Sequence, residues 1–84
     1  MGVIHREQGF RFVIFTDDHE PAHVHVFGSG EMRVRLIGPD GLPELMTSWG
    51  FKKSDQRKVL KIVLSQQADF LKRWIEIHGK DRQS

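Results

Sequence analysis

Two neighbouring segments alternate apolar and polar residues on either side of a short glycine-bearing loop. Residues 23–27 precede Gly28-Ser29-Gly30, and residues 31–37 follow it. Because successive side chains of a strand point to opposite faces, the alternation predicts two strands. The loop between them is of the kind that closes a hairpin. A β-hairpin is therefore the feature that most restricts the folds open to this chain.

The register of this hairpin follows from matching the faces of its two strands. It makes five pairs: Phe27 with Glu31, Val26 with Met32, His25 with Arg33, Val24 with Val34, and His23 with Arg35. Apolar side chains then meet on one face, and two histidines meet two arginines on the other, so the register is self-consistent. We expect the apolar face to pack under a helix and the other, here called the histidine face, to stay open.

The rest of the chain predicts further strands and one helix. Residues 10–16 are rich in aromatic and β-branched side chains, which favours a strand. Residues 42–47 could form a fourth strand that a proline confines to an edge. Apolar residues then recur at helical spacing between Ser54, which suits an N-cap, and Gly79, a natural stop. We expect an α+β fold, a small antiparallel sheet of three to four strands with one long C-terminal amphipathic helix, residues 55–78, packed on one face.

Size and composition favour one soluble domain, 1–84. Of its 84 residues, 38% are hydrophobic and 29% charged, and self-association could add stability to a chain this short. It has neither a signal-peptide pattern nor an apolar run near the ~20 residues of a membrane helix, so we expect a cytoplasmic protein with no membrane partner. The absence of cysteine excludes disulfides and thiol catalysis. The net charge of +2 permits an anionic partner, nucleic acid included, without requiring one.

The candidate functional residues lie in and beside the segment DHEPAHVHV, residues 18–26. The binding candidates are Asp18, His19, His23, His25, Arg33 and Arg35. One interpretation is a metal site, in which His23 and His25 are ligands completed by His19, Asp17 or Asp18. Against it, the arginine pair would repel a divalent cation and cannot accept the hydrogen bond that a metal-bound imidazole donates.

Three further interpretations stay open. The histidines could act as acid and base on RNA without a metal, while Arg33 or Arg35 holds the phosphate. Alternatively, the face binds an anion or a protein without chemistry, or the histidines only satisfy hydrogen bonds around Pro21. Because the usual catalytic signatures are missing, we favour a non-enzymatic role with no cofactor, and keep a divalent metal as the alternative.

The same residues carry a resemblance to a known family. The strings are GFRFVIFTDDHEPAHVHV, then GSGE, then GF before a helix ending in LKRWIEIHG. From about residue 4 to 79 the chain resembles the bacterial domain-of-unknown-function family 4160. The D-H-x-P-x-H-x-H-V core of that family is matched by Asp18, His19, Pro21, His23, His25 and Val26. Ala22 stands where the family usually has a second proline, which loosens the turn and leaves the histidines in place.

The resemblance implies a small cytoplasmic bacterial protein with no established activity. Genes of this family often lie beside those of another uncharacterised family, number 2442, in pairs that look like two-component modules of toxin–antitoxin type. A small protein partner encoded nearby is therefore implied. Our leading hypothesis is a non-enzymatic binding component of such a two-gene module, acting on a protein partner or on a nucleic acid or other anion. The alternative is a histidine-dependent enzyme, either metal-binding or a metal-free ribonuclease.

Overall fold

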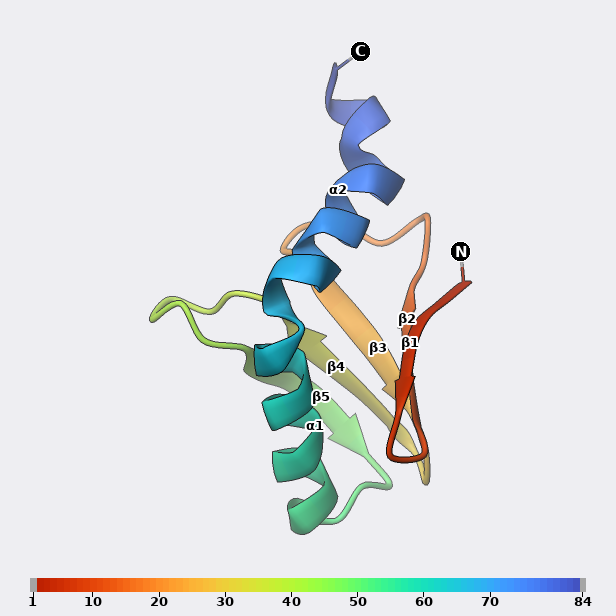
Figure 1. Ribbon diagram of the computed structural model, residues 1–84, viewed down its shortest axis with the longest axis vertical. Helices are drawn as coiled ribbons and strands as arrows, with labels where there is room; N and C mark the ends of the chain where they lie inside the picture. The colour runs from red at the N-terminus through yellow and green to blue at the C-terminus, as the bar shows by residue number, and fades with distance from the viewer. Residues whose placement is uncertain (1, 84) are drawn as a thin grey trace.

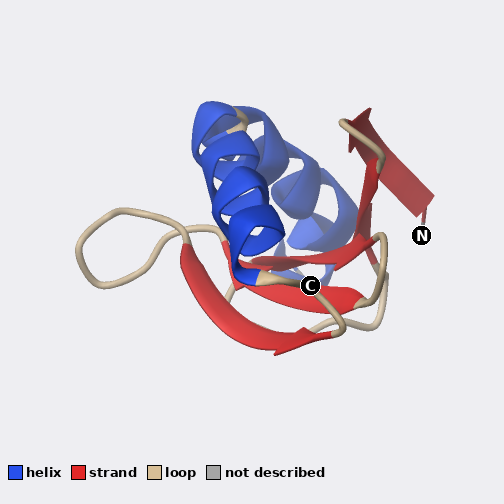
Figure 2. Cartoon of the chain, turned by 90° about the horizontal axis from the view of Figure 1, so that it is seen from below, coloured by secondary structure: helices blue, strands red, loops and turns tan. Residues whose placement is uncertain are grey.

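The computed structural model describes the backbone of residues 2–83 and the side chains of residues 2–79. The elements in chain order are β1 (Gly2–Glu7), β2 (Phe10–Ile14), β3 (His23–Phe27), β4 (Glu31–Arg35), β5 (Glu44–Trp49), α1 (Lys53–Ser65) and α2 (Gln67–Gln83). The five strands form one sheet in sequence order, and every neighbouring pair is antiparallel (Figure 1). Both helices lie on the same face of the sheet, which curves around them (Figure 2). The predicted α+β class is confirmed.

The hairpin of β3 and β4 has the predicted register at all five pairs. Its apolar face is fully buried, with Val24, Val26, Met32 and Val34 in the core beneath the helices. Phe12 of β2 and Phe70 of α2 join the same core, with their ring centroids 5.6 Å apart. The alternation of the two strands therefore decided which face the helices cover.

The sheet has five strands where three to four were expected. The missed strand is β1, which pairs with β2 through a two-residue turn. The turn residues Gln8 and Gly9 both have positive φ, 54° and 84°, as a type I′ turn requires. An irregularity between Val3 and His5 shifts the register of β1, so its sequence lacks the strict alternation by which a strand is predicted.

Several strand bounds also differ from the prediction. β2 ends at Ile14 instead of residue 16, because the Phe15 carbonyl turns to accept the backbone N–H of Asp18 at 3.2 Å. β4 ends at Arg35 instead of residue 37. The fourth predicted strand is β5, Glu44–Trp49 instead of 42–47, and it lies at the sheet edge as its preceding proline indicated.

The single helix predicted over residues 55–78 is two helices. The first begins at Lys53, because the Lys52 carbonyl already accepts the backbone N–H of Gln56 at 3.0 Å. The chain leaves helical geometry at Gln66, where φ is −107° and ψ is 12°. Next to this break the Gln67 side chain donates to the Leu36 and Gly41 carbonyls at 2.8 and 3.0 Å. No glycine or proline marks the break, so the apolar periodicity runs across it unchanged.

The far end of the helical region also differs from the prediction. α2 continues to Gln83, so Gly79 is a position inside the helix and not its stop. No helix within residues 2–83 has the length and apolar composition needed to cross a membrane.

Candidate functional site

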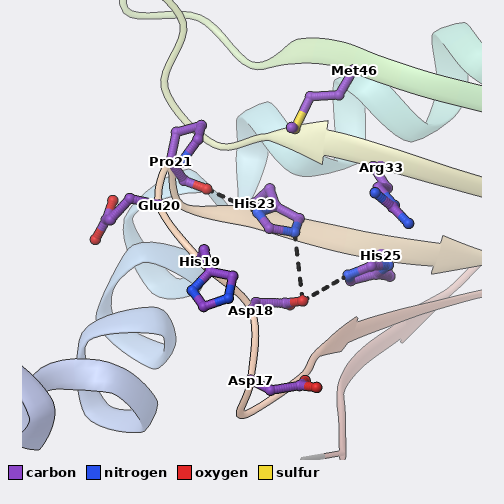
Figure 3. A pocket seen from close by; sticks show the side chains of 9 residues that line it. All are labelled: Asp17, Asp18, His19, Glu20, Pro21, His23, His25, Arg33 and Met46. Carbon is purple, nitrogen blue, oxygen red and sulfur yellow. Dashed lines mark hydrogen bonds and ion pairs between the residues drawn. The ribbon is translucent and has the colours of Figure 1, made fainter.

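The loop between β2 and β3, residues 15–22, returns over the histidine face and brings Asp18 against His23 and His25 (Figure 3). Phe15 also packs edge-on against the His25 ring, with centroids 4.6 Å apart. As a result His23 and His25 are only 7% and 6% exposed. The expectation of an open face is therefore wrong at the histidines, because a loop that strand alternation cannot place covers them.

Each ring nitrogen of the two histidines faces an oxygen atom. His23 Nδ1 lies 2.8 Å from the Pro21 carbonyl oxygen, and His25 Nδ1 lies 3.3 Å from Glu31 Oε2. The two Nε2 atoms converge on one atom, Asp18 Oδ1, at 3.7 Å from His23 and 3.2 Å from His25. Carbonyl and ionised carboxylate oxygens only accept hydrogen bonds, so the Nδ1 atom of His23 carries a proton that it donates to Pro21.

The two histidines have too few N–H groups to donate a hydrogen bond at each of these four contacts. A neutral imidazole has one N–H, and two neutral imidazoles cannot donate to four acceptor contacts. With both Nδ1 atoms protonated, the two Nε2 lone pairs point at the Asp18 carboxylate. No atom of that group then donates a hydrogen bond, and a cation held between the three atoms would relieve the electrostatic repulsion.

The spacing of these atoms suits a metal ion. Asp18 Oδ1, His23 Nε2 and His25 Nε2 all lie within 4.8 Å of one another. Metal bonds of about 2.0–2.2 Å in tetrahedral geometry separate neighbouring ligand atoms by roughly 3.3–3.6 Å. The two Asp18 distances, 3.2 and 3.7 Å, lie close to that range. Two of the three distances between the candidate ligand atoms therefore lie near the separation that a tetrahedral ion requires.

The β2–β3 loop is held by a hydrogen bond within itself and by hydrogen bonds to α2. Asp18 Oδ2 accepts the backbone N–H of Phe15 at 3.1 Å, which orients the carboxylate. On the helix side, Trp74 Nε1–H donates to Glu20 Oε2 at 3.4 Å, and His78 Nε2 lies 3.2 Å from the Phe15 carbonyl. Both ends of the loop are thus tied to α2.

The two arginines of the histidine face have different positions. Arg33 lines the pocket, and its side chain is exposed. Arg35 is not among the pocket residues, and its Nη1 lies 3.7 Å from Glu44 Oε1 on β5. Of the two arginines expected to repel a metal ion, only Arg33 therefore lines the pocket, and its guanidinium is exposed.

The remaining candidates lie around a pocket of about 260 Å³. It is lined by Asp17, Asp18, His19, Glu20, Pro21, His23, His25, Arg33 and Met46 (Figure 3). His19 is exposed at its rim and does not belong to the group of converging ligand atoms. Met46 is the extra residue of a bulge in β5, since Arg33 pairs with Thr47 and Val34 with Leu45. The bulge explains how an edge strand contributes a side chain here.

Sequence reasoning missed Glu31 and Trp74 as parts of the site. Glu31 was detectable, because the predicted register puts it on the histidine face, diagonal to His25. Trp74 was assigned to the core, where it does lie, and its ring centroid is 5.5 Å from that of His23. The hydrogen bond from its indole N–H to the loop depends on how α2 packs against the sheet. A local sequence pattern does not predict this packing.

One of the comparisons with known proteins gives a match, which covers most of the chain. The model of a protein family described as "Domain of unknown function (DUF4160)" matches residues 9–75, which include every candidate site residue. Neither the curated proteins nor the solved structures gave a match. The description of the family states no activity, so the function has to be argued from the site itself.

Proposed function

We propose that this chain, which belongs to the DUF4160 family, is a divalent-metal-binding protein that holds one ion between Asp18, His23 and His25. The observation that carries the proposal is the set of four imidazole nitrogens that all face acceptor oxygens. A cation bound by the two Nε2 atoms and Asp18 Oδ1 satisfies all four, because each Nδ1–H then keeps its own oxygen partner.

The outer partners of the histidines support this proposal. Metal-binding imidazoles almost always donate their second N–H to a carboxylate or a carbonyl oxygen. His25 has the Glu31 carboxylate in that position and His23 has the Pro21 carbonyl. Two points counted against a metal in the sequence, the repulsion by the arginine pair and the lack of such acceptors, and the second considered only the arginines. We therefore prefer metal binding to the metal-free alternatives.

The ligand set further favours a reactive site over a structural one. Structural zinc sites are closed by four protein ligands, whereas catalytic sites keep a position open. Two histidines and one carboxylate leave positions free, and the pocket of about 260 Å³ gives access to them. A metal in such a site can polarise a bound group or lower the pKa of a bound water. The function we propose is thus that of a metal-dependent enzyme, with Asp18, His23 and His25 as metal ligands.

The test is a metal titration of the chelator-treated protein. We expect the wild-type chain to bind one equivalent of Zn²⁺ by calorimetry, and the variants Asp18→Asn and His25→Ala to lose this binding. His19→Ala is the matched control, because His19 is on the same loop and lines the pocket without joining the ligand atoms. Far-UV circular dichroism of each metal-free variant checks the fold.

Two results would overturn the proposal. If Zn²⁺, Mn²⁺, Co²⁺ and Ni²⁺ all fail to bind stoichiometrically, the three converging atoms do not hold a metal ion. If His19→Ala weakens binding as much as His25→Ala does, the ion is bound at the rim of the pocket and not at the three converging atoms.

Non-enzymatic binding is the second candidate function. Trp49, 77% exposed, and Met46 lie on the edge strand β5 and present apolar surface next to Arg33. From the family resemblance, the partner we propose is a small protein encoded nearby in a two-gene bacterial module. A double variant His23→Ala/His25→Ala that keeps every partner of the wild-type protein would exclude the histidine face from this role.

A further inference from the structure

Arg33 differs from the other arginines of the central strands. Arg35 lies near Glu44, and the Arg11 guanidinium lies 5.7 Å from the centroid of the Phe27 ring. Within residues 2–79, where side chains are described, Arg33 has neither an acidic nor an aromatic partner. It is nevertheless placed beside the ligand group, because its backbone pairs with that of His25. Its charge is therefore available to a molecule that enters the pocket.

The distribution of charge around a bound ion favours an anion beside Arg33. The carboxylates of Asp18 and Glu31 are the acids that contact the two histidines, and they balance the two charges of a divalent metal, so the positive charge next to His25 is that of Arg33. The other acids of the pocket, Asp17 and Glu20, belong to the β2–β3 loop. Figure 3 shows Glu20 on the far side of His23 from Arg33. An anion that binds between the metal and Arg33 therefore avoids the acidic side of the pocket.

On the basis of the proposed function, we infer that Arg33 and the metal together bind a phosphate group, so that the substrates are phosphate-bearing molecules. A guanidinium offers two parallel N–H donors that match the oxygens of a phosphate. Phosphate has further oxygens that point elsewhere, so one can bind the metal while two accept from Arg33. A carboxylate has only two oxygens, so one of them would have to bind the metal and accept from Arg33 at the same time. Phosphate makes the three contacts with three separate oxygens, which is why we name phosphate as the ligand.

The test measures phosphate binding to the zinc-loaded protein. Zinc content is determined first, and inorganic phosphate is then titrated into the wild-type chain and the variants Arg33→Ala and Arg11→Ala. We expect Arg33→Ala to bind phosphate at least tenfold more weakly. Arg11→Ala removes the same charge from β2, outside this pocket, and should bind phosphate as the wild type does. Acetate serves as the carboxylate probe.

The outcomes separate this inference from the proposed function. Zinc binding with equal phosphate affinity in Arg33→Ala and wild type overturns the inference and leaves the metal site standing, as does acetate binding as tight as phosphate. Failure to bind zinc overturns the proposed function itself. A second arm with a short single-stranded RNA distinguishes the source of the phosphate. Tighter binding than inorganic phosphate, with the same dependence on Arg33, indicates a nucleic acid, whereas RNA binding that ignores Arg33 counts against the inference.

Discussion

The substitution Glu31→Gln tests whether the hydrogen bond behind His25 tunes a metal site. Glu31 Oε2 lies 3.3 Å from His25 Nδ1, and the Glu31 side chain is 43% exposed. A glutamine keeps the shape and can still accept from Nδ1–H through its amide oxygen, but it removes the negative charge. The change therefore acts on the basicity of His25 and leaves the three ligand atoms in place.

The size of the effect follows from the surroundings of the two imidazoles. Loss of an outer hydrogen-bond partner typically weakens metal binding by about 10–100-fold. Only one of the two histidines is affected here, because the partner of His23 is a backbone carbonyl that no side-chain substitution removes. The Glu31 contact is also long and partly exposed. We therefore expect a loss of about tenfold in Zn²⁺ affinity, which corresponds to about 1.4 kcal/mol.

Calorimetric titration with Zn²⁺ measures this loss. The matched control is Glu44→Gln, which removes an equivalent exposed carboxylate that pairs with Arg35 and does not contact a histidine. The thermal midpoint of the metal-free protein should change little in either variant. An unchanged affinity in Glu31→Gln, or an equal loss in Glu44→Gln, would refute the assignment of Glu31 as the outer partner of a metal ligand.

Two further predictions concern the fold that holds the site. Phe70→Ala removes a fully buried ring that contacts Phe12. It should lower the free energy of unfolding by about 3–5 kcal/mol in urea titrations, and a loss below about 1 kcal/mol would contradict the assigned core. Gly30→Ala should destabilise strongly, because a Cβ there would collide with the Trp49 carbonyl oxygen. Gly79→Ala, where a Cβ meets only an ordinary contact inside α2, should instead stabilise by about 0.5–1 kcal/mol; thermal melts that rank the two glycine variants the other way round would reject both assignments.

The central hairpin could be predicted from sequence because two constraints agree there. Matching apolar and polar faces fixes the register, and the glycine loop fixes where the chain turns, so all five pairs are confirmed. β1 could not be predicted, because its irregular pairing removes the alternation. The break at Gln66 is also absent from the pattern, since it depends on where Gln67 finds the Leu36 and Gly41 carbonyls.

The three residues whose side-chain atoms converge, Asp18, His23 and His25, were named from sequence, but their arrangement and the partners Glu31 and Trp74 were not. His23 and His25 share a face by strand periodicity alone, and Asp18 was named with them as a candidate. The strand register also puts Arg33 and Arg35 beside the histidines, but it does not predict where the guanidinium groups at the ends of these long side chains lie. Arg35 turns to Glu44 on the edge strand, and the β2–β3 loop covers the histidines. Both facts depend on segments far from the motif, so the balance between metal and anion binding could not be judged from sequence.

The attachment of the Asp18 loop to α2 has a consequence for the order in which the protein matures. The ribosome completes the proposed metal ligands, Asp18, His23 and His25, well before Trp74 and His78, which hold the loop through Glu20 and Phe15. A growing chain could thus form the hairpin that carries the two histidines while the carboxylate still lacks its final support. We expect stable loading of an ion to be a late step of biosynthesis, one that waits until the second helix has docked.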